Sequence, residues 1–322
     1  MAEHVVDKLV ALASSLKGGV IPVRAPAKVN LRLKVVGRRD DGYHLLSMLN
    51  CTTSLCDELG ISFPSGADIR LTIEPDGVLE GESVESNLVV KAFRAFWRAY
   101  GIDDPPVGFF CSMTKKIPIG GGLGGGSSDA GAVLRVLSSV FGALLRTELG
   151  ISQAEERERV LQAALSCGAD VPYAYIGGLC WVSGVGERVR PLSKHVLSPA
   201  RILILVPSTA VNTKAFYDYF RRRYPEVLAK EDPSMWQFVE SLDSAVSSVI
   251  ENDFEPAVCE LAPSVGEGLA LARRYFPATT SLTGSGSAFF SLVPEGQEGA
   301  MSELSSVAQG RGFSVYPCTL SA

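Results

Sequence analysis

The polar and apolar residues near the start of the chain alternate with a period of two. Residues 23–36 place apolar side chains on one face, and the opposite face carries Arg24, Lys28, Asn30, Arg32 and Lys34. This pattern is typical of a strand with one buried face. A turn at 38–42 precedes a second strand over about 43–56, and residues 58–63 and 67–73 indicate further strands of a mainly antiparallel sheet.

From Asn87 onward the apolar spacing becomes that of a helix. Asn87 is a preferred N-cap residue and Gly101 follows the last apolar position, so a helix is predicted between them. The same reasoning predicts a strand over 107–117, helices over 127–141 and 152–166, and a hairpin over 178–192.

The second part of the chain alternates short strands and helices. The pattern predicts strands over 201–207, 279–283, 287–293 and 312–318, with helices over 213–223, 234–250, 264–275 and 295–308. Such alternation favours a small α+β sandwich. We therefore expect an α+β protein with an N-terminal domain over 1–195 and a C-terminal domain over 196–322.

Residues 1–20 form an appended segment in this interpretation. Val5, Leu9, Leu12 and Leu16 recur at helical spacing, which predicts a short amphipathic helix. The acidic Glu3 and Asp7 and the scarcity of arginine argue against a signal or transit peptide.

Composition narrows the class of protein. The net charge of −5 argues against a nucleic-acid-binding surface, although it leaves room for a local basic pocket. Seven cysteines without a CxxC pair signal neither zinc nor a disulfide framework, so we interpret them as reduced thiols of a cytoplasmic protein. We find no apolar run of the roughly 18 residues that a membrane span needs.

A glycine-rich stretch follows the predicted strand over 107–117 and opens a helix. Between Gly120 and Gly126 only Leu123 is not glycine, and Ser127 and Ser128 come next. Glycines let the backbone wrap closely around an anion, and a helix N-terminus presents free N–H groups and a positive dipole end. Together these features predict a phosphate cradle.

The glycine stretch has three other possible interpretations. Glycines also serve tight packing, although six in seven positions exceed what a flexible loop requires. A Walker A loop fails because no lysine follows the glycines. Gly120, Gly122 and Gly125 fit the GxGxxG spacing of a Rossmann site, but they do not lie in an N-terminal βαβ unit.

The stretch 116–130, KIPIGGGLGGGSSDA, resembles the phosphate-binding motif of the GHMP kinases, and its long form is similar to that of the diphosphocytidyl-methylerythritol kinases. The runs 26–31, PAKVNL, and 37–44, GRRDDGYH, resemble the same family, and the second is its most specific motif. The resemblance implies that the ATP phosphates are held by Pro118, Ile119, Gly120, Gly121, Gly122, Leu123, Gly124, Gly125, Gly126, Ser127 and Ser128.

The resemblance also implies a fold and a reaction. The fold would be the two-domain GHMP kinase fold, with an N-terminal ribosomal-protein-S5-like domain and a C-terminal ferredoxin-like sandwich. The reaction would be transfer of the ATP γ-phosphoryl group to the 2-hydroxyl of a cytidine-diphosphate-linked methylerythritol in the non-mevalonate isoprenoid pathway. Mg²⁺ would bridge the phosphates, with Ser128 and Asp129 as candidate ligands only. A monomer or weak homodimer without nucleic-acid or membrane partners is expected.

By the same resemblance, Lys28 lies beside the catalytic base and the acceptor hydroxyl, and Asn30 contacts the substrate. Tyr43 and His44 would hold the cytidine end, since they supply a stacking surface and hydrogen bonds. Taken alone, Lys28 and Asn30 are also compatible with a solvated strand face, and His44 with a loop histidine.

Asp170 is the candidate general base. Residues 168–172 resemble the family's Gly-Ala-Asp-Val-Pro motif, whose aspartate orients the proton of the attacking hydroxyl. A neighbouring Lys28 would keep this carboxyl ionised. From the sequence alone, an aspartate before Val-Pro is equally an ordinary turn cap.

Two further motifs lie in the second half. Residues 281–287 resemble the third GHMP motif, with Thr283 in place of the usual serine, and Gly284, Ser285 and Gly286 would approach the phosphates. Residues 211–217 resemble a Val-Ser-Thr-x-x-x-Tyr stretch with Asn212 in place of serine, and Tyr217 would stack on the cytosine. A tight turn and a helix-core tyrosine remain the alternatives.

The motifs that resemble the family occur in order from residue 26 to about 290. Residues 220–252 contain no clear motif of the family. Two rival functions stay open. One is another GHMP kinase, such as a homoserine or mevalonate kinase, against which the GRRDDGYH run argues. The other is a catalytically silent nucleotide- or RNA-binding module, against which Lys28, Asp170 and the acidic net charge argue.

Overall fold

The computed structural model describes residues 3–75, 83–192, 200–224, 236–237 and 246–321. The chain forms two compact units, each built from separate stretches of sequence. Unit 1 comprises 1–26, 56–116 and 125–176, and unit 2 comprises 27–55, 117–124 and 177–322. Two long strands, β1 (Ile21–Arg38) and β2 (His44–Ser62), contribute residues to both units. The domain boundary expected near 195 lies outside the described residues and stays a prediction.

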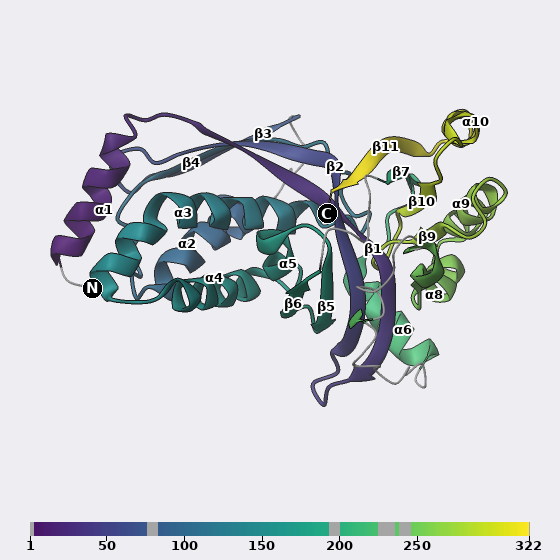
Figure 1. Ribbon diagram of the computed structural model, residues 1–322, viewed down its shortest axis with the longest axis horizontal. Helices are drawn as coiled ribbons and strands as arrows, with labels where there is room; N and C mark the ends of the chain where they lie inside the picture. Colours follow the sequence, from purple (N-terminus) through teal and green to yellow (C-terminus); the bar gives the residue numbers. More distant parts are fainter. Residues whose placement is uncertain (1–2, 76–82, 193–199, 225–235, 238–245, 322) are drawn as a thin grey trace. The chain divides into compact units, whose positions relative to one another are not determined.

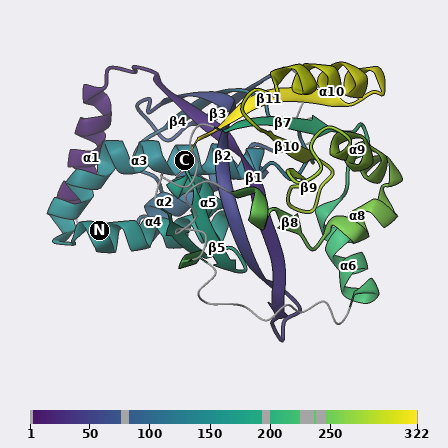
Figure 2. The same cartoon turned by 45° about the vertical axis from the view of Figure 1, so that its right-hand side comes forward.

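Unit 1 combines a helical layer with a small sheet (Figure 1). Strand β4 lies between β2, to which it is antiparallel, and β3, to which it is parallel. Helices α2, α3 and α4 run side by side in both views (Figure 2). The elements of unit 1 besides β1 and β2 are α1 (Glu3–Ser15), β3 (Ile69–Glu74), η1 (Val84–Ser86), α2 (Leu88–Ala99), β4 (Phe109–Thr114), α3 (Gly125–Leu149), α4 (Gln153–Cys167) and α5 (Val171–Ile176).

The core of unit 1 confirms the predicted helices. Asn87 caps α2, because its side chain accepts the backbone N–H of Val89. Phe93 of α2 stacks on Phe109 of β4 with ring centroids 4.5 Å apart. The predicted N-terminal helix is α1, and it buries Leu9. Helix α3 runs eight residues beyond the predicted end at 141, because its last two turns keep packing on the core.

Helix α3 is the one helix among the described residues that is long and apolar enough to cross a membrane by length and composition. In its most apolar window 67% of the residues are buried within the protein. A core helix of a globular unit has these properties as well, and α3 packs on α2, α4 and α5.

Unit 2 is built on an antiparallel sheet with strand order β2-β11-β7-β10-β9, on which α9 and α10 pack. Its elements besides β1 and β2 are β5 (Cys180–Gly184), β6 (Arg188–Pro191), β7 (Arg201–Val206), α6 (Thr213–Arg223), η3 (Val246–Val249), β8 (Glu251–Asn252), α8 (Glu255–Leu261), α9 (Pro263–Arg273), β9 (Thr280–Leu282), β10 (Phe289–Val293), α10 (Glu298–Gly310) and β11 (Ser314–Ser321).

Most predicted elements of unit 2 are confirmed, including the hairpin β5–β6 and helix α6 over its predicted range. The helix predicted over 264–275 is α9, which begins with Pro263 at its first turn, and the short α8 before it was not predicted. Most of the helix predicted over 234–250 lies outside the described residues. The seven cysteines are free thiols, and the α+β class is confirmed.

Candidate active site

The glycine-rich turn leads directly into α3. Gly120, Gly122 and Gly124 have positive φ angles of 74°, 76° and 71°, a backbone conformation in which a side chain is strained. Helix α3 begins at the next residue, so its first N–H groups follow the turn without a linker. A turn of this kind can hold an anion, and the assignment of this one as a phosphate cradle stays a prediction.

The residues around these glycines differ in exposure. The side chain of Leu123 is 1% exposed and packs into the core of unit 2, so only its backbone belongs to the turn. Ile119 is 57% exposed. Leu123 therefore anchors the turn to the core, while Ile119 presents an apolar side chain next to it.

A second small-residue loop, 283–287, packs against the glycine turn within unit 2. The N–H of Ala288 donates to the carbonyl of Gly121 at 3.1 Å. A Cβ at Gly122 would lie 2.7 Å from the carbonyl oxygen of Thr283, so any side chain there would displace the loop. The two candidate ATP-binding segments of unit 2 are therefore in direct contact.

Lys28 and Asn30 lie beside both loops. The N–H of Lys28 donates to the carbonyl of Leu123 at 2.9 Å, and its Nζ donates to Asn30 Oδ1 at 2.7 Å. The N–H of Asn30 donates to the Thr283 hydroxyl at 3.0 Å, and its side-chain amide donates to Asn50 Oδ1 at 2.6 Å. Lys28 is 7% exposed and Asn30 is fully buried, which excludes the alternative of a solvated strand face.

His44 and Tyr217 are brought together from distant parts of the sequence. Their rings stack with centroids 5.6 Å apart at 29°, and His44 also meets the edge of Phe220 at 5.5 Å. Burial lowers the pKa of His44 below its usual value, and the positive charges of Arg38 and Arg221 lower the pKa further. A buried, neutral imidazole next to a phenol ring offers stacking and hydrogen bonding to a flat polar ligand.

Tyr43 differs from its neighbour His44. Its side chain is 64% exposed, and its N–H donates to Asp41 Oδ1 at 3.2 Å in the turn that contains Gly42. The exposed phenol ring is available to an incoming ligand.

Asp170 belongs to unit 1, where it directly precedes α5. Its backbone carbonyl accepts the N–H of Ala174 at 3.0 Å, so it occupies the start of that helix. Helix α5 packs tightly on α3, because a Cβ at Gly131 would lie 2.6 Å from the carbonyl carbon of Ala174. The position of Asp170 is thus fixed through α5 and the absence of a side chain at Gly131.

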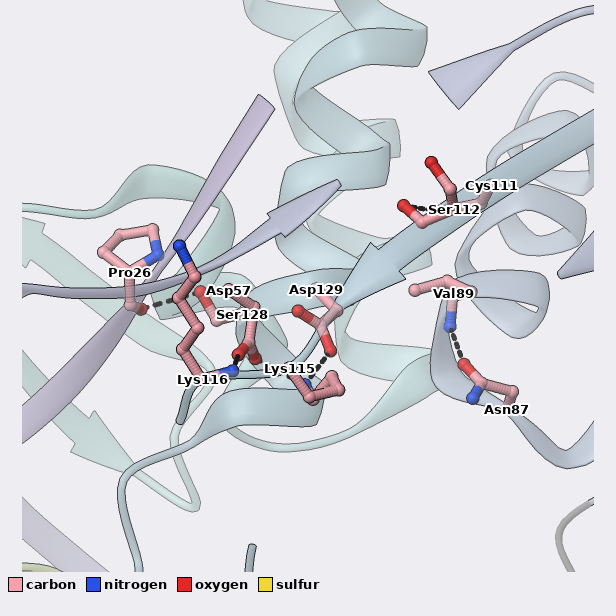
Figure 3. A network of polar contacts seen from close by, with 10 residues as sticks. All are labelled: Pro26, Asp57, Asn87, Val89, Cys111, Ser112, Lys115, Lys116, Ser128 and Asp129. Carbon is pink, nitrogen blue, oxygen red and sulfur yellow. Dashed lines mark hydrogen bonds and ion pairs between the residues drawn. The ribbon is translucent and has the colours of Figure 1, made fainter. Parts of the chain in front are cut away.

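The first turns of α3 are tied to their surroundings in unit 1 (Figure 3). The buried hydroxyl of Ser128 donates to the carbonyl of Pro26 at 2.7 Å. Lys115 pairs with both Asp57 and Asp129, and all three side chains are at most 6% exposed. Asp57 also accepts the N–H of Lys116. This buried triad joins the strands before the turn to the helix after it.

The triad places two carboxyl groups and one ammonium group in a buried environment. Burial raises the pKa of the Asp129 carboxyl to about 7, with Lys115 opposing and Asp57 adding to the rise. Burial alone would lower the pKa of Lys115, but the two carboxylates raise it overall. The Oδ1 atom of Asp129 is buried without a hydrogen-bond partner in the described part of the chain.

The candidate metal ligands do not form a metal site of their own. Ser128 is bonded to Pro26, and one oxygen of Asp129 is bonded to Lys115. Over the described ranges no group of three or more His, Cys, Asp or Glu side chains is placed to hold a metal ion. Mg²⁺ typically needs only one or two carboxylates when substrate phosphates supply other ligands. The residues present therefore suit a metal that arrives with nucleotide phosphates.

Two contacts at the site have no sequence signal. The hydrogen bond between Thr283 and Asn30 spans 253 residues, so no local pattern predicts it. Asp57 and Lys115 lie in no recognisable motif, and their ion pair is visible only in the structure. Their pairing depends on the register between β2 and β4.

Comparisons with known proteins agree with this geometry. The GHMP kinases N terminal domain family matches residues 87–178. The chain is 32% identical over 293 residues to the 4-diphosphocytidyl-2-C-methyl-D-erythritol kinase of Citrifermentans bemidjiense, covering 90% of this chain and 95% of the relative. It is 35% identical over 284 residues to the protein of that name from Polaromonas sp., covering 85% and 84%.

Solved structures show the same relationship. A crystal structure of 4-(cytidine 5'-diphospho)-2C-methyl-D-erythritol kinase superposes with a TM-score of 0.69 at 30% identity, covering 94% of this chain and all of the other. Mevalonate kinase from Methanococcus jannaschii has a TM-score of 0.64 at 15% identity, covering 95% of this chain and all of the other, and shows a shared fold.

The sequence identity over most of both chains decides the family. The chain belongs to the GHMP kinases, and within them to the family of 4-diphosphocytidyl-2-C-methyl-D-erythritol kinases.

Proposed function

We propose that this protein transfers the γ-phosphoryl group of ATP to the 2-hydroxyl group of 4-diphosphocytidyl-2-C-methyl-D-erythritol, in the non-mevalonate route to isoprenoid precursors. The observation that carries the proposal is the position of Lys28 at the glycine turn: its backbone N–H donates to the carbonyl of Leu123, and a Cβ at Gly124 would lie 3.4 Å from its Cε. A cation buried beside a phosphate cradle is what phosphoryl transfer requires, because the reaction depends on positioning and on neutralisation of phosphate charge.

The nucleotide phosphates are assigned to the two loops of small residues. The backbone N–H groups of Gly120–Gly126 and the start of α3, with the hydroxyl of Ser127, would hold the phosphate chain. Gly284, Ser285 and Gly286 would approach it from the second loop, in line with the contact between that loop and Gly122.

Lys28 and Asp170 are the proposed catalytic residues. Asp170 would accept or orient the proton of the attacking 2-hydroxyl group. Lys28 would stabilise negative charge on the acceptor oxygen and on the transferred phosphoryl group. Asn30 fixes the lysine through the 2.7 Å bond to Lys28 Nζ, and the same amide is proposed to contact the acceptor.

The cytidine end is assigned to Tyr43, His44 and Tyr217. The stack of His44 on Tyr217 provides a flat, partly buried surface for a pyrimidine. The neutral imidazole can donate or accept a hydrogen bond at the edge of the base. This pair favours a cytidylated acceptor over homoserine or mevalonate, which contain no ring.

Mg²⁺ is proposed to accompany ATP, and when bound it would neutralise part of the charge of the phosphates. We also propose that the protein has two domains divided at about 195 and that it is cytoplasmic. It would be a monomer or a weak dimer, without nucleic-acid or membrane partners.

An acceptor panel tests the proposed function. Purified protein with MgATP is offered 4-diphosphocytidyl-2-C-methyl-D-erythritol, homoserine or mevalonate, and ADP release is measured. We expect ADP with the cytidylated acceptor alone. ADP with homoserine or mevalonate instead would identify another GHMP kinase, and nucleotide binding without turnover on any acceptor would identify a silent binding module.

A further inference from the structure

We propose that Arg38 and Arg221 form an anion subsite beside His44 and Tyr217, and that this subsite binds the diphosphate group of the cytidine-linked substrate. The inference rests on the proposed function, since that function supplies a substrate with a diphosphate next to its pyrimidine. All four residues belong to unit 2.

The fold directs both guanidinium groups to one turn. Arg38 is the last residue of β1. Arg221 lies four residues after Tyr217 on α6, so the side chains of Tyr217 and Arg221 share one face of that helix. A Cβ at Gly42 would lie 3.6 Å from Arg221 Nη1 and 3.9 Å from Arg38 Nη2. Two residues separated by 183 positions in the sequence thus meet at the turn that carries His44.

The described carboxylates at this turn pair with Arg39 and Arg221 and leave Arg38 without an ion-pair partner among the described residues. Arg221 Nη2 bonds to Asp218 at 3.1 Å, and the neighbouring Arg39 pairs with Asp41 at 2.7 Å. Arg38 makes no ion pair with any residue that the structure describes. Two guanidinium groups that lie close together repel each other, and an anion between them would relieve the repulsion.

Donor groups also remain available for a ligand. The Nε atom of Arg221 is buried and has no hydrogen-bond partner among the described residues. A guanidinium group carries five N–H donors in a planar fork that matches the oxygens of a phosphate. Both guanidinium groups contribute to lowering the pKa of His44, which places them close to the imidazole against which the pyrimidine is proposed to lie.

Open space borders Arg38. A wide, open surface cavity of about 480 Å³ is lined by Arg38, Arg39, Asp40, Asp41 and Leu45. The carboxylates of Asp40 and Asp41 also line the cavity, and Asp41 is paired with Arg39, so an anion would be favoured only at the Arg38 end. A diphosphate extending from the His44–Tyr217 pair would meet the two guanidinium groups at this end.

Binding of CDP and of cytidine separates the proposed subsite from the rest of the pocket. Titration calorimetry measures both ligands on wild type, Arg38→Ala and Arg221→Ala. We expect each variant to weaken the binding of CDP on the order of 10-fold or more, because charge-assisted hydrogen bonds are lost. The affinity for cytidine should stay unchanged. Arg222→Ala is the matched control, because it removes an exposed arginine from the same helix and should leave both affinities unchanged.

Steady-state kinetics and conservative variants complete the test. Arg38→Ala and Arg221→Ala should raise KM for the cytidylated acceptor and change kcat less than about threefold, since the subsite holds the ground state and transition state alike. Arg221→Lys keeps the charge and should restore part of the CDP affinity. Circular dichroism verifies that each variant is folded.

The outcomes distinguish the two proposals. Equal losses for CDP and cytidine, or no loss for either, would overturn the diphosphate subsite and assign the arginines a packing role. A wild-type protein that binds CDP through these arginines but does not phosphorylate the cytidylated acceptor would overturn the proposed function and leave the subsite standing.

Discussion

The backbone N–H of Asn30 donates to the side-chain hydroxyl of Thr283 across 253 residues of sequence, at 3.0 Å. Both residues are buried, and the same hydroxyl lies 3.3 Å from Asn30 Oδ1, the atom that accepts from Lys28. A single hydroxyl therefore links the loop after β9 to the proposed catalytic lysine.

Removal of this hydroxyl should destabilise unit 2 and disturb Lys28. Thr283→Val keeps the side-chain shape but leaves the buried N–H of Asn30 without an acceptor, which costs about 1–3 kcal/mol. Urea unfolding should show that loss, and kcat should fall with it. Thr283→Ser keeps the hydroxyl and should retain both stability and kcat. Equal stability of the valine variant and wild type would contradict the importance of this bond.

Loss of the proposed base should slow the chemical step and spare nucleotide binding. Asp170→Asn keeps the volume and removes the carboxylate, so kcat should fall by about 10²–10⁴ while the Kd for ATP changes little. Asp103→Asn alters an exposed carboxyl of the same unit and serves as the control. Unchanged kcat in the Asp170 variant would exclude Asp170 as the base.

The aromatic ring of Tyr217 should contribute to acceptor binding through its face. Tyr217→Ala should raise KM for the cytidylated acceptor by about 10-fold or more, because stacking on a base is worth about 1–3 kcal/mol. Tyr217→Phe keeps the ring and should stay near wild type, and KM for ATP should change in neither variant. If the alanine variant kept its acceptor KM, Tyr217 would be a helix-core residue only.

A side chain at Gly131 should push α5 away from α3. The added Cβ of Gly131→Ala would lie 2.6 Å from the carbonyl carbon of Ala174, and such overpacking costs about 1–3 kcal/mol. Since Asp170 directly precedes α5, kcat should fall as well. Gly299→Ala, in α10, meets no atom within 4 Å and should stabilise the protein slightly. If Gly131→Ala left both stability and kcat unchanged, α5 would be shown to shift without cost.

The buried carboxyl of Asp129 should make stability depend on pH. Its pKa of about 7 in the folded protein exceeds the usual 3.8, so the native state binds more protons than the unfolded state between those values. The contribution of this group to the free energy of unfolding therefore falls as the pH rises from about 4 to 7.

Replacement of Asp129 isolates that contribution. Asp129→Asn cannot ionise, so its stability relative to wild type should rise from pH 5 to pH 8 by about 1–3 kcal/mol. Denaturant unfolding at both pH values measures the difference, with the exposed Asp103→Asn as control. A stability difference between the variant and wild type that does not change with pH would show that the pKa of Asp129 is not raised in the folded protein.

The sequence determined the features that depend on neighbours along the chain. Asn87 caps α2 because an N-cap needs only the residues that follow it, and the glycine run sets its own backbone conformation. Local periodicity also predicted α6 over its full range. The short α5 and α8 escaped prediction, because one or two turns carry too little periodicity and are stabilised by packing on longer elements.

Tertiary structure alone decided which distant residues meet. The stack of His44 on Tyr217, the bond from Asn30 to Thr283, the Lys115 triad and the approach of Arg221 to Arg38 depend on strand register and helix placement. The motifs named candidates for the site, but packing determined that Leu123 is a core anchor and that Ser128 bonds to Pro26. Contacts of this kind arise when burial fixes the chain in three dimensions, and local spacing does not encode them.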